Sequence, residues 1–216
     1  MSHYFIVCDF DGTITERDTL DLVVHRYAPE VWDRVEQRLR AGEVDLLQAM
    51  QEEFTAVRAT EAEVVAYVLE NVLIRPGFAR FVDWVEEGGH DLVVVSAGFR
   101  VLIDPILRQA GLHRLHVHAG DALFTREGTA LSFPPSNAEC LAECAHCKSE
   151  TIAAHGPFSG PVVYIGDGYS DRCAAQEADV VFAREGLADY LAGLGLPYLP
   201  FDTFDDIVAA LEALAD

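Results

Sequence analysis

The chain has little positive charge and no long apolar run, and each shortage excludes a class of protein. Fifteen Lys and Arg residues stand against 36 Asp and Glu, a formal charge of -21, so long-range repulsion argues against nucleic acid or an anionic membrane surface as a partner. No stretch is long and apolar enough for a membrane span, and no cationic segment precedes an apolar core at the N-terminus, so no export signal is indicated. Five cysteines, an odd number, do not form a secreted disulfide framework and favour the cytoplasm.

Lysine is the scarcest charged residue, because Lys148 is the only one and the other cations are all Arg. An ammonium is a compact point charge that Arg cannot replace in a tight site. Lys148 is therefore a candidate for binding an anion, with a chance surface lysine as the alternative.

The strongest pattern lies near the N-terminus. Residues 4–8 form an unbroken apolar run, which is typical of a central parallel strand covered on both faces. Asp9 and Asp11 follow it directly, and Gly12 and Thr13 supply a backbone that can fold around an anion. Open α/β sheets bind ligands beyond the carboxyl ends of their strands. The sequence therefore predicts a ligand site here, and a plain Asp-Gly turn is the alternative.

The rest of the chain alternates between helical and strand patterns. Apolar residues at helical spacing fill 18–70, which predicts several short helices that form either a lid over the carboxylates or a layer on the sheet. Further strands are expected at 92–96, 115–119, 161–165 and 179–183, a hairpin or flap at 121–133, and helices at 78–87, 99–109, 187–194 and 204–214. This alternation predicts an α/β fold with a parallel sheet.

Polar residues follow two more of these strands. Ser96 ends the second strand, and Asp167 and Asp171 follow the strand at 161–165. Carboxylates from different strands can converge on Mg²⁺, and one carboxylate can attack phosphorus while a second carries a proton. Ser96 and Lys148 can hold the phosphoryl oxygens. Each residue alone is a weak signal, since a Ser here is more often a helix cap and Gly-Asp-Gly is more often a turn.

Together, Asp9-Phe-Asp11-Gly-Thr-Ile-Thr, the strand ending in Ser96-Ala-Gly, Lys148 and Gly166-Asp167-x-x-x-Asp171 resemble the four motifs of the haloacid dehalogenase superfamily of phosphatases. The resemblance implies a Rossmannoid sheet flanked by helices, in a core domain of residues 1–16 and 74–216, with an inserted type 1 helical cap at residues 17–73.

The resemblance also implies roles for single residues. Asp9 would be the nucleophile and a Mg²⁺ ligand, and Asp11 the acid/base and a ligand through its backbone carbonyl. Asp167 would be the third protein ligand, and Asp171 would hold metal-bound waters or Lys148. The residues implied in binding phosphate or substrate are Gly12, Thr13, Ser96, Ala97, Gly98, Lys148 and Asp18; Asp18 stands where phosphoserine phosphatases carry a Glu that contacts the substrate amine.

The function implied is Mg²⁺-dependent hydrolysis of a small phosphorylated metabolite in the cytoplasm. A finer resemblance, carried by residues 6–15, Cys144-x-x-Cys147-Lys148, 165–171 and Phe182-Ala-Arg184, is to a methionine-salvage subfamily of these phosphatases. The alternatives are a phosphatase for phosphoserine, phosphocholine or phosphoethanolamine, a phosphomutase that uses the same residues, and a non-catalytic module that binds a phosphometabolite.

A cysteine cluster precedes the lysine. Cys140, Cys144 and Cys147, with His146 among them, could bind a structural Zn²⁺, form a disulfide or stay as thiols. The spacing leaves all three readings open.

Overall fold

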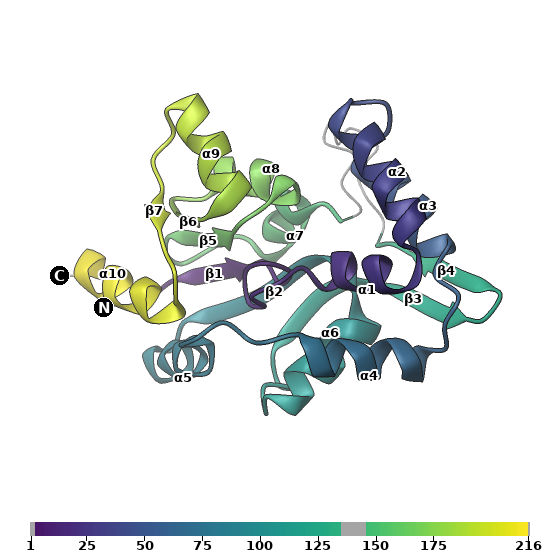
Figure 1. Cartoon of the computed structure of the whole chain (residues 1–216). Coiled ribbons are helices and arrows are strands. Elements are labelled where there is room, and N and C mark those ends of the chain that lie inside the picture. The colour runs from purple at the N-terminus through teal and green to yellow at the C-terminus, as the bar shows by residue number, and fades with distance from the viewer. Residues whose placement is uncertain (1–2, 135–145, 216) are drawn as a thin grey trace.

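A seven-stranded sheet runs through the middle of the molecule (Figure 1). The computed structural model describes residues 3–134 and 146–215. The strands are β1 (Phe5–Cys8), β2 (Asp91–Phe99), β3 (His116–Thr125), β4 (Gly128–Ser132), β5 (Val162–Gly166), β6 (Val180–Ala183) and β7 (Leu199–Pro200). Their order across the sheet is β4, β3, β2, β1, β5, β6, β7. All neighbours are parallel except β3 and β4, so the predicted α/β fold is confirmed, with one antiparallel strand at its edge.

Helices cover both faces of this sheet. They are α1 (Thr19–Tyr27), α2 (Pro29–Arg40), α3 (Leu46–Thr55), α4 (Glu61–Asn71), α5 (Phe78–Gly88), α6 (Arg100–Gln109), α7 (Lys148–His155), α8 (Arg172–Glu177), α9 (Glu185–Leu194) and α10 (Phe204–Ala215), with a 3₁₀ turn, η1 (Tyr169–Asp171). In the part of the chain that the structure describes, none has the length and hydropathy to cross a bilayer.

The two faces of β1 contact different helical layers. Ile6 and Cys8 belong to the larger hydrophobic core, with side chains of α5, α6 and α10, whereas Phe5 and Val7 pack with side chains of α7, α8 and α9. Successive side chains of a strand point to opposite faces, so a strand covered on both sides must be apolar throughout. This explains the unbroken apolar run and places the end of β1 in the centre of the molecule.

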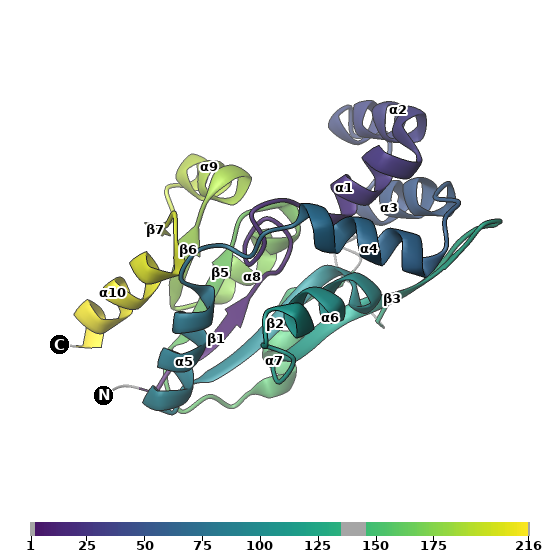
Figure 2. The same cartoon turned by 60° about the horizontal axis from the view of Figure 1, so that its bottom comes forward.

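Helices α1 to α4 form the helical block that the sequence predicts between β1 and α5. Asp18 caps α1 by accepting two backbone N–H bonds, Pro29 opens α2, and Thr60 with Glu63 forms a capping box at α4; such caps satisfy the free N–H groups of a first helical turn. Helices α2 and α3 rise beyond the carboxyl ends of the strands, whereas α4 lies alongside α6 (Figures 1 and 2). Different helices of the block therefore lie beyond the strand ends and against the sheet layer, and the role of a lid stays a prediction.

The connections into and out of this block lie side by side. Thr15 and Ile74 form an isolated antiparallel bridge, and the Arg75 N–H donates to the Ile14 carbonyl at 2.8 Å. The block also shares the main hydrophobic core, since Phe54 of α3 packs edge-to-face on Phe99 at 5.0 Å between ring centroids. The helices above the site are therefore anchored to the sheet.

The expectation of a short strand at 115–119 followed by a separate hairpin is wrong in one respect. β3 is continuous from His116 to Thr125: its first half pairs with β2 and its second half with β4. The hairpin is confirmed, but it extends the sheet and contacts the helical block, where Thr129 Oγ1 donates to the Val57 carbonyl at 3.1 Å. In the order of the sheet β3 lies between β2 and β4, so it pairs with both.

Candidate active site

The predicted carboxylates and the lysine converge at the carboxyl ends of the two central strands. Asp9 follows β1 and Asp167 follows β5, and these strands are parallel neighbours. Carboxylate oxygens of Asp9, Asp167 and Asp171 lie within 4.8 Å of one another. Lys148 is the first residue of α7 and reaches the same point.

Lys148 joins two of these carboxylates. Its side chain is almost fully buried, and Nζ donates to Oδ1 of Asp9 and to Oδ1 of Asp171. Burial lowers the pKa of Lys148, but the carboxylates of Asp171 and Asp9 raise it by more, so the net pKa lies above its ordinary range. The ammonium therefore stays charged.

Asp171 has its lone pairs engaged by the protein. Oδ2 accepts the backbone N–H groups of Asp167 at 3.0 Å and Gly168 at 2.8 Å, and Oδ1 accepts from Lys148 and from the Tyr164 hydroxyl at 2.6 Å. This fully buried carboxylate fixes the loop that presents Asp167 and orients the lysine. It is not free to coordinate a metal directly.

The Asp11 carboxylate accepts three hydrogen bonds. Its Oδ1 accepts from the hydroxyl and the backbone N–H of Thr19, the latter at 3.0 Å, and its Oδ2 accepts from Ser96 Oγ at 3.0 Å. Ser96 Oγ in turn accepts the Gly98 N–H at 2.8 Å. A Cβ on Gly98 would lie 2.8 Å from Asp11 Oδ2, so only glycine fits beside this carboxylate.

Arg75 holds the loop between Asp11 and the helical block. Its guanidinium donates to the carbonyls of Gly12 at 2.6 Å, Thr13 at 2.7 Å and Thr15 at 3.2 Å. Gly12 has φ of +79°, a conformation that glycine adopts without strain. Thr13 Oγ1 donates to Asp167 Oδ1 at 2.5 Å. Gly12 and Thr13 therefore link the first loop to the carboxylate from β5.

The negative charge of the site exceeds what one lysine balances. Burial, then repulsion by Asp171, raises the pKa of Asp9 well above its usual range and that of Asp167 to about 7. Burial also raises the pKa of Asp11, although hydrogen bonds from Thr19 and Ser96 oppose this. Among the described residues Lys148 is the one cation that forms an ion pair with any of these four carboxylates.

These carboxylates fit a divalent cation. The nearby donors are oxygens, which Mg²⁺ prefers, and a bound cation would relieve the repulsion that raises the pKa values of Asp9 and Asp167. Gly12 adds to the fit, because a Cβ at this position would contact the Asp167 carboxylate. Asp9 and Asp167 could hold the ion with their side chains.

A cavity of about 220 Å³ lies between the carboxylates and the helical block. Asp9, Asp11, Asp167 and residues 96–98 line it from the sheet. The residues that line it from the helical block are Asp18, Leu20, Asp21, Glu36, Leu39, Leu46, Ala49, Met50, Glu53 and Phe54. None of the described residues lining the cavity is Lys or Arg.

Glu53 is the unusual residue of the cavity wall. It is 9% exposed, and no hydrogen bond or ion pair joins its carboxyl group to any described residue. Burial, then repulsion by Asp21, Glu36 and Glu52, raises the pKa of Glu53 to about 8. Glu53 therefore carries a proton at pH 7 and can donate a hydrogen bond into the cavity.

The structure brings most of the predicted residues together. Asp18 lines the cavity, but its carboxylate also caps α1. Residues of the cysteine cluster give less information, because Cys140 and Cys144 lie outside the described residues and Cys147 immediately precedes α7. The zinc reading stays a prediction.

Three buried residues of the site are absent from the sequence-based predictions: Thr19, Arg75 and Tyr164. Each donates hydrogen bonds to another site residue or to a loop of the site. The only signal for Arg75 was its place before Pro76-Gly77, which predicts a turn and says nothing about its contacts.

Comparisons with known proteins place this chain in a family. A family model described as haloacid dehalogenase-like hydrolase matches residues 6–176. The 2-hydroxy-3-keto-5-methylthiopentenyl-1-phosphate phosphatase of Brevibacillus brevis is 30% identical over 209 residues, which cover 96% of this chain and 94% of that protein. The protein of the same name from Geobacillus kaustophilus is 30% identical, covering 97% of this chain and 96% of its own length.

Solved structures show the same fold. A phosphoserine phosphatase bound as a phospho-aspartyl intermediate analogue superposes with a TM-score of 0.71 at 16% identity, covering 97% of this chain and 99% of that one. A substrate-bound phosphoserine phosphatase gives a TM-score of 0.70 at 18% identity, covering 97% and 98%.

Proposed function

The chain belongs to the haloacid dehalogenase-like hydrolases, and we propose that it is a Mg²⁺-dependent phosphomonoesterase acting through an aspartyl-phosphate at Asp9. One observation carries this proposal: Asp9, Asp11 and Asp167 lie at the base of a cavity, and Asp9 is ion-paired with the only lysine of the chain. A nucleophile, a proton carrier and a phosphate-binding cation are thus assembled where a phosphate ester can enter.

Hydrolysis would proceed in two displacements. A carboxylate oxygen of Asp9 attacks phosphorus, a new O–P bond forms, and the bond from phosphorus to the leaving-group oxygen breaks while Asp11 protonates that oxygen. Asp11, now ionised, takes a proton from water, which attacks phosphorus and releases inorganic phosphate and Asp9. Lys148 stabilises the charge on the phosphoryl oxygens; removing such a group typically costs ~10²–10³-fold in rate.

Mg²⁺ would be held by the side chains of Asp9 and Asp167 and by the Asp11 backbone carbonyl. When bound, it neutralises charge on the phosphoryl group and on the carboxylates. Asp171 keeps the metal-bearing loop and Lys148 in place through four hydrogen bonds. The backbone of Gly12, Thr13, Ala97 and Gly98, with the Ser96 hydroxyl, would surround the phosphoryl group.

Residues 17–73 would act as the cap that selects the leaving group, with residues 1–16 and 74–216 as the core domain. We take 2-hydroxy-3-keto-5-methylthiopentenyl-1-phosphate as the first candidate substrate, because relatives of that name match nearly the whole chain. Apolar side chains including Met50 and Phe54 line the cap side of the cavity and suit a thioether tail. Protonated Glu53 can donate to a keto or hydroxyl oxygen. The reaction belongs in the cytoplasm, in keeping with the cysteine content.

An ammonium-bearing phosphate such as phosphoethanolamine or phosphocholine is the second candidate. Asp18, Asp21 and Glu36 line the cavity beside Glu53, and an ammonium group would pair with those of the four acids that are ionised. Phosphoserine fits less well, since its carboxylate would meet no Lys or Arg among the described residues lining the cavity.

A substrate panel tests the proposal. Phosphate release is measured with Mg²⁺ and with EDTA for the methionine-salvage phosphate, phosphoserine, phosphoethanolamine and phosphocholine. We expect Mg²⁺-dependent release, with the highest kcat/KM on the first compound. Binding without turnover on every compound would make the chain a non-catalytic module, and transfer of the phosphoryl group back to product would make it a mutase.

A further inference from the structure

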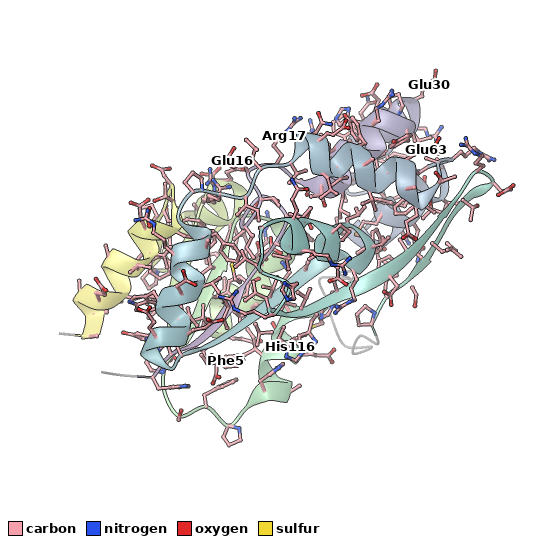
Figure 3. All side chains as sticks on the ribbon, turned by 90° about the horizontal axis from the view of Figure 1, so that it is seen from below. Phe5, Glu16, Arg17, Glu30, Glu63 and His116 are labelled. Atoms are coloured by element: carbon pink, nitrogen blue, oxygen red, sulfur yellow. The ribbon has the colours of Figure 1, made fainter. Side chains whose placement is uncertain are left out.

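Three histidines gather away from the cavity, on the sheet face covered by α7. His116 and His118 are alternate residues of β3 and therefore share one face of that strand, and His155 ends α7. One ring nitrogen from each lies within 4.8 Å of the others. In Figure 3, His116 lies beside Phe5 on the side of the molecule opposite the labelled residues of the helical block, Glu30 and Glu63.

The three rings contact one another pairwise. His116 and His118 stack with centroids 4.6 Å apart and planes 20° apart. The His155 ring stands edge-on to both, at 5.2 Å from His118 and 6.0 Å from His116. The three rings therefore lie close enough for one nitrogen of each to approach a shared ion.

The hydrogen bonds leave ligand lone pairs available. His155 Nδ1 donates to the Thr151 carbonyl at 2.7 Å, so its Nε2 carries the lone pair, and such a bond from the second nitrogen is the usual support of a metal-binding histidine. His118 Nε2 is buried and has no hydrogen-bond partner among the described residues. A buried polar atom without a partner destabilises a fold, and a metal ion would satisfy it.

The surrounding charges allow a cation. Arg100 donates to both carboxylate oxygens of Asp104 at 3.2 Å and to the Val117 carbonyl, between the two strand histidines, at 2.8 Å. His146 lies next to His118, with ring centroids 6.4 Å apart, and its Nε2 is hydrogen-bonded to Thr151 Oγ1 at 2.8 Å.

We propose that His116, His118 and His155 form a site for a divalent transition-metal ion such as Zn²⁺, which fastens α7 to β3. Imidazole nitrogens suit Zn²⁺, and three of them with one water complete a four-coordinate site. Helix α7 carries Lys148 on its first residue and His155 on its last. The ion would therefore stabilise the helix that presents the lysine, without touching the carboxylates, and this site stands independently of the proposed reaction.

The test uses untagged full-length protein stripped of metal, with excess Mg²⁺ present to occupy the carboxylate site. Zn²⁺ binding is measured by calorimetry and thermal unfolding, and Co²⁺ is added separately to identify donors by visible absorption. We expect one Zn²⁺ equivalent that depends on the three histidines, a rise in Tm, and a four-coordinate Co²⁺ spectrum; a thiolate charge-transfer band would come from the cysteines and is scored separately. His155→Ala and His118→Gln should each weaken binding on the order of 10²-fold and remove the rise in Tm.

His113→Ala is the matched control, since His113 is an exposed histidine outside the cluster; it should bind Zn²⁺ like the wild type. Wild-type affinity in both His155→Ala and His118→Gln would overturn the proposal. So would the absence of Zn²⁺ binding to the wild type, or a Co²⁺ spectrum that neither His155→Ala nor His118→Gln changes. Circular dichroism of the metal-free variants establishes that each is folded before binding is compared.

Discussion

Replacing Asp167 with Asn should stabilise the metal-free protein above neutral pH. Burial, then repulsion by Asp171, raises the pKa of Asp167 to about 7, whereas an unfolded chain gives Asp about 4. The folded state therefore binds this proton more tightly than the unfolded state. Ionisation of Asp167 destabilises the fold progressively as pH rises from about 4 to about 7, and the penalty is complete above that window.

The loss in free energy of unfolding follows from the interval between the unfolded and the folded pKa of Asp167. About three pH units at ~1.4 kcal/mol each give an upper value of ~4 kcal/mol. Asp167 is only partly buried, so solvent screening reduces this, and we expect about 2 kcal/mol. Asn removes the charge but keeps an oxygen that can accept the hydrogen bond from Thr13 Oγ1. The substitution therefore measures the effect of the charge on stability and leaves this hydrogen bond in place.

The assay is urea denaturation in EDTA at pH 5 and at pH 8, with exposed Asp189→Asn of α9 as the control. The gain in stability of Asp167→Asn over the wild type should be small at pH 5, where about one third of the penalty applies, and complete at pH 8. Added Mg²⁺ should then stabilise the wild type and the control but not Asp167→Asn, since only an intact site binds the ion in the native state. Lower stability than the wild type at pH 8 in EDTA, or a full response to Mg²⁺, would refute the reasoning.

Three further changes give distinct outcomes. Thr19→Val removes a hydroxyl whose hydrogen bond lowers the pKa of Asp11, so the pKa of Asp11 should rise. Because the pKa of the general acid sets the basic limb of the profile of kcat/KM against pH, that limb should move to higher pH. A limb that does not move contradicts the role of Asp11 as the acid. Because the pKa of Glu53 is raised to about 8, its ionisation should raise the KM of the wild type above pH 8. Glu53→Gln keeps a neutral donor, so its kcat/KM should stay within about 3-fold of the wild type at pH 7 and its KM should not rise above pH 8. A large loss at pH 7 together with a preference for phosphoethanolamine would show that the ionised acid binds an ammonium. Tyr164→Phe removes the buried hydrogen bond to Asp171 and should cost ~1.5–3 kcal/mol in urea denaturation; an unchanged midpoint argues against that bond.

The centre of the fold and the assembly of the site could be predicted because both follow from strand ends. The apolar run before Asp9 had to be a strand covered on both faces, and the run before Asp167 had the same form. Parallel neighbours end at the same edge of a sheet, so the two carboxylates had to approach each other. The roles of the site residues remain predictions for the experiments above.

Residues that hold other residues could not be predicted in this way. Arg75 binds backbone carbonyls of the loop 12–15, and Tyr164 reaches Asp171 from within a strand. A backbone carbonyl has no identity in the sequence, so no spacing marks its partner. Thr19 next to Asp18 reads as an ordinary helix start, and only the approach of the loop to α1 turns its hydroxyl toward Asp11.

The edge of the sheet and the cavity wall could not be predicted from the sequence, for different reasons. The hydrophobic pattern of β3 changes partway because its partner changes from β2 to β4, which looks like two elements in the sequence. Glu53 reads as one charge on an amphipathic helix, and its burial depends on how α3 packs against α1 and α2. The helix α7 is short, with no side-chain cap to mark its start at Lys148.

The central claim is that Asp9 becomes phosphorylated during turnover, and trapping that species tests it most directly. Wild-type protein is mixed with substrate and Mg²⁺, quenched in acid within one turnover and digested for mass spectrometry. One phosphoryl group should be found on the peptide that contains Asp9, and none in Asp9→Asn, which should fold normally and release no phosphate. Turnover at the wild-type rate by Asp9→Asn, or a phosphoryl group on another residue, would contradict the account.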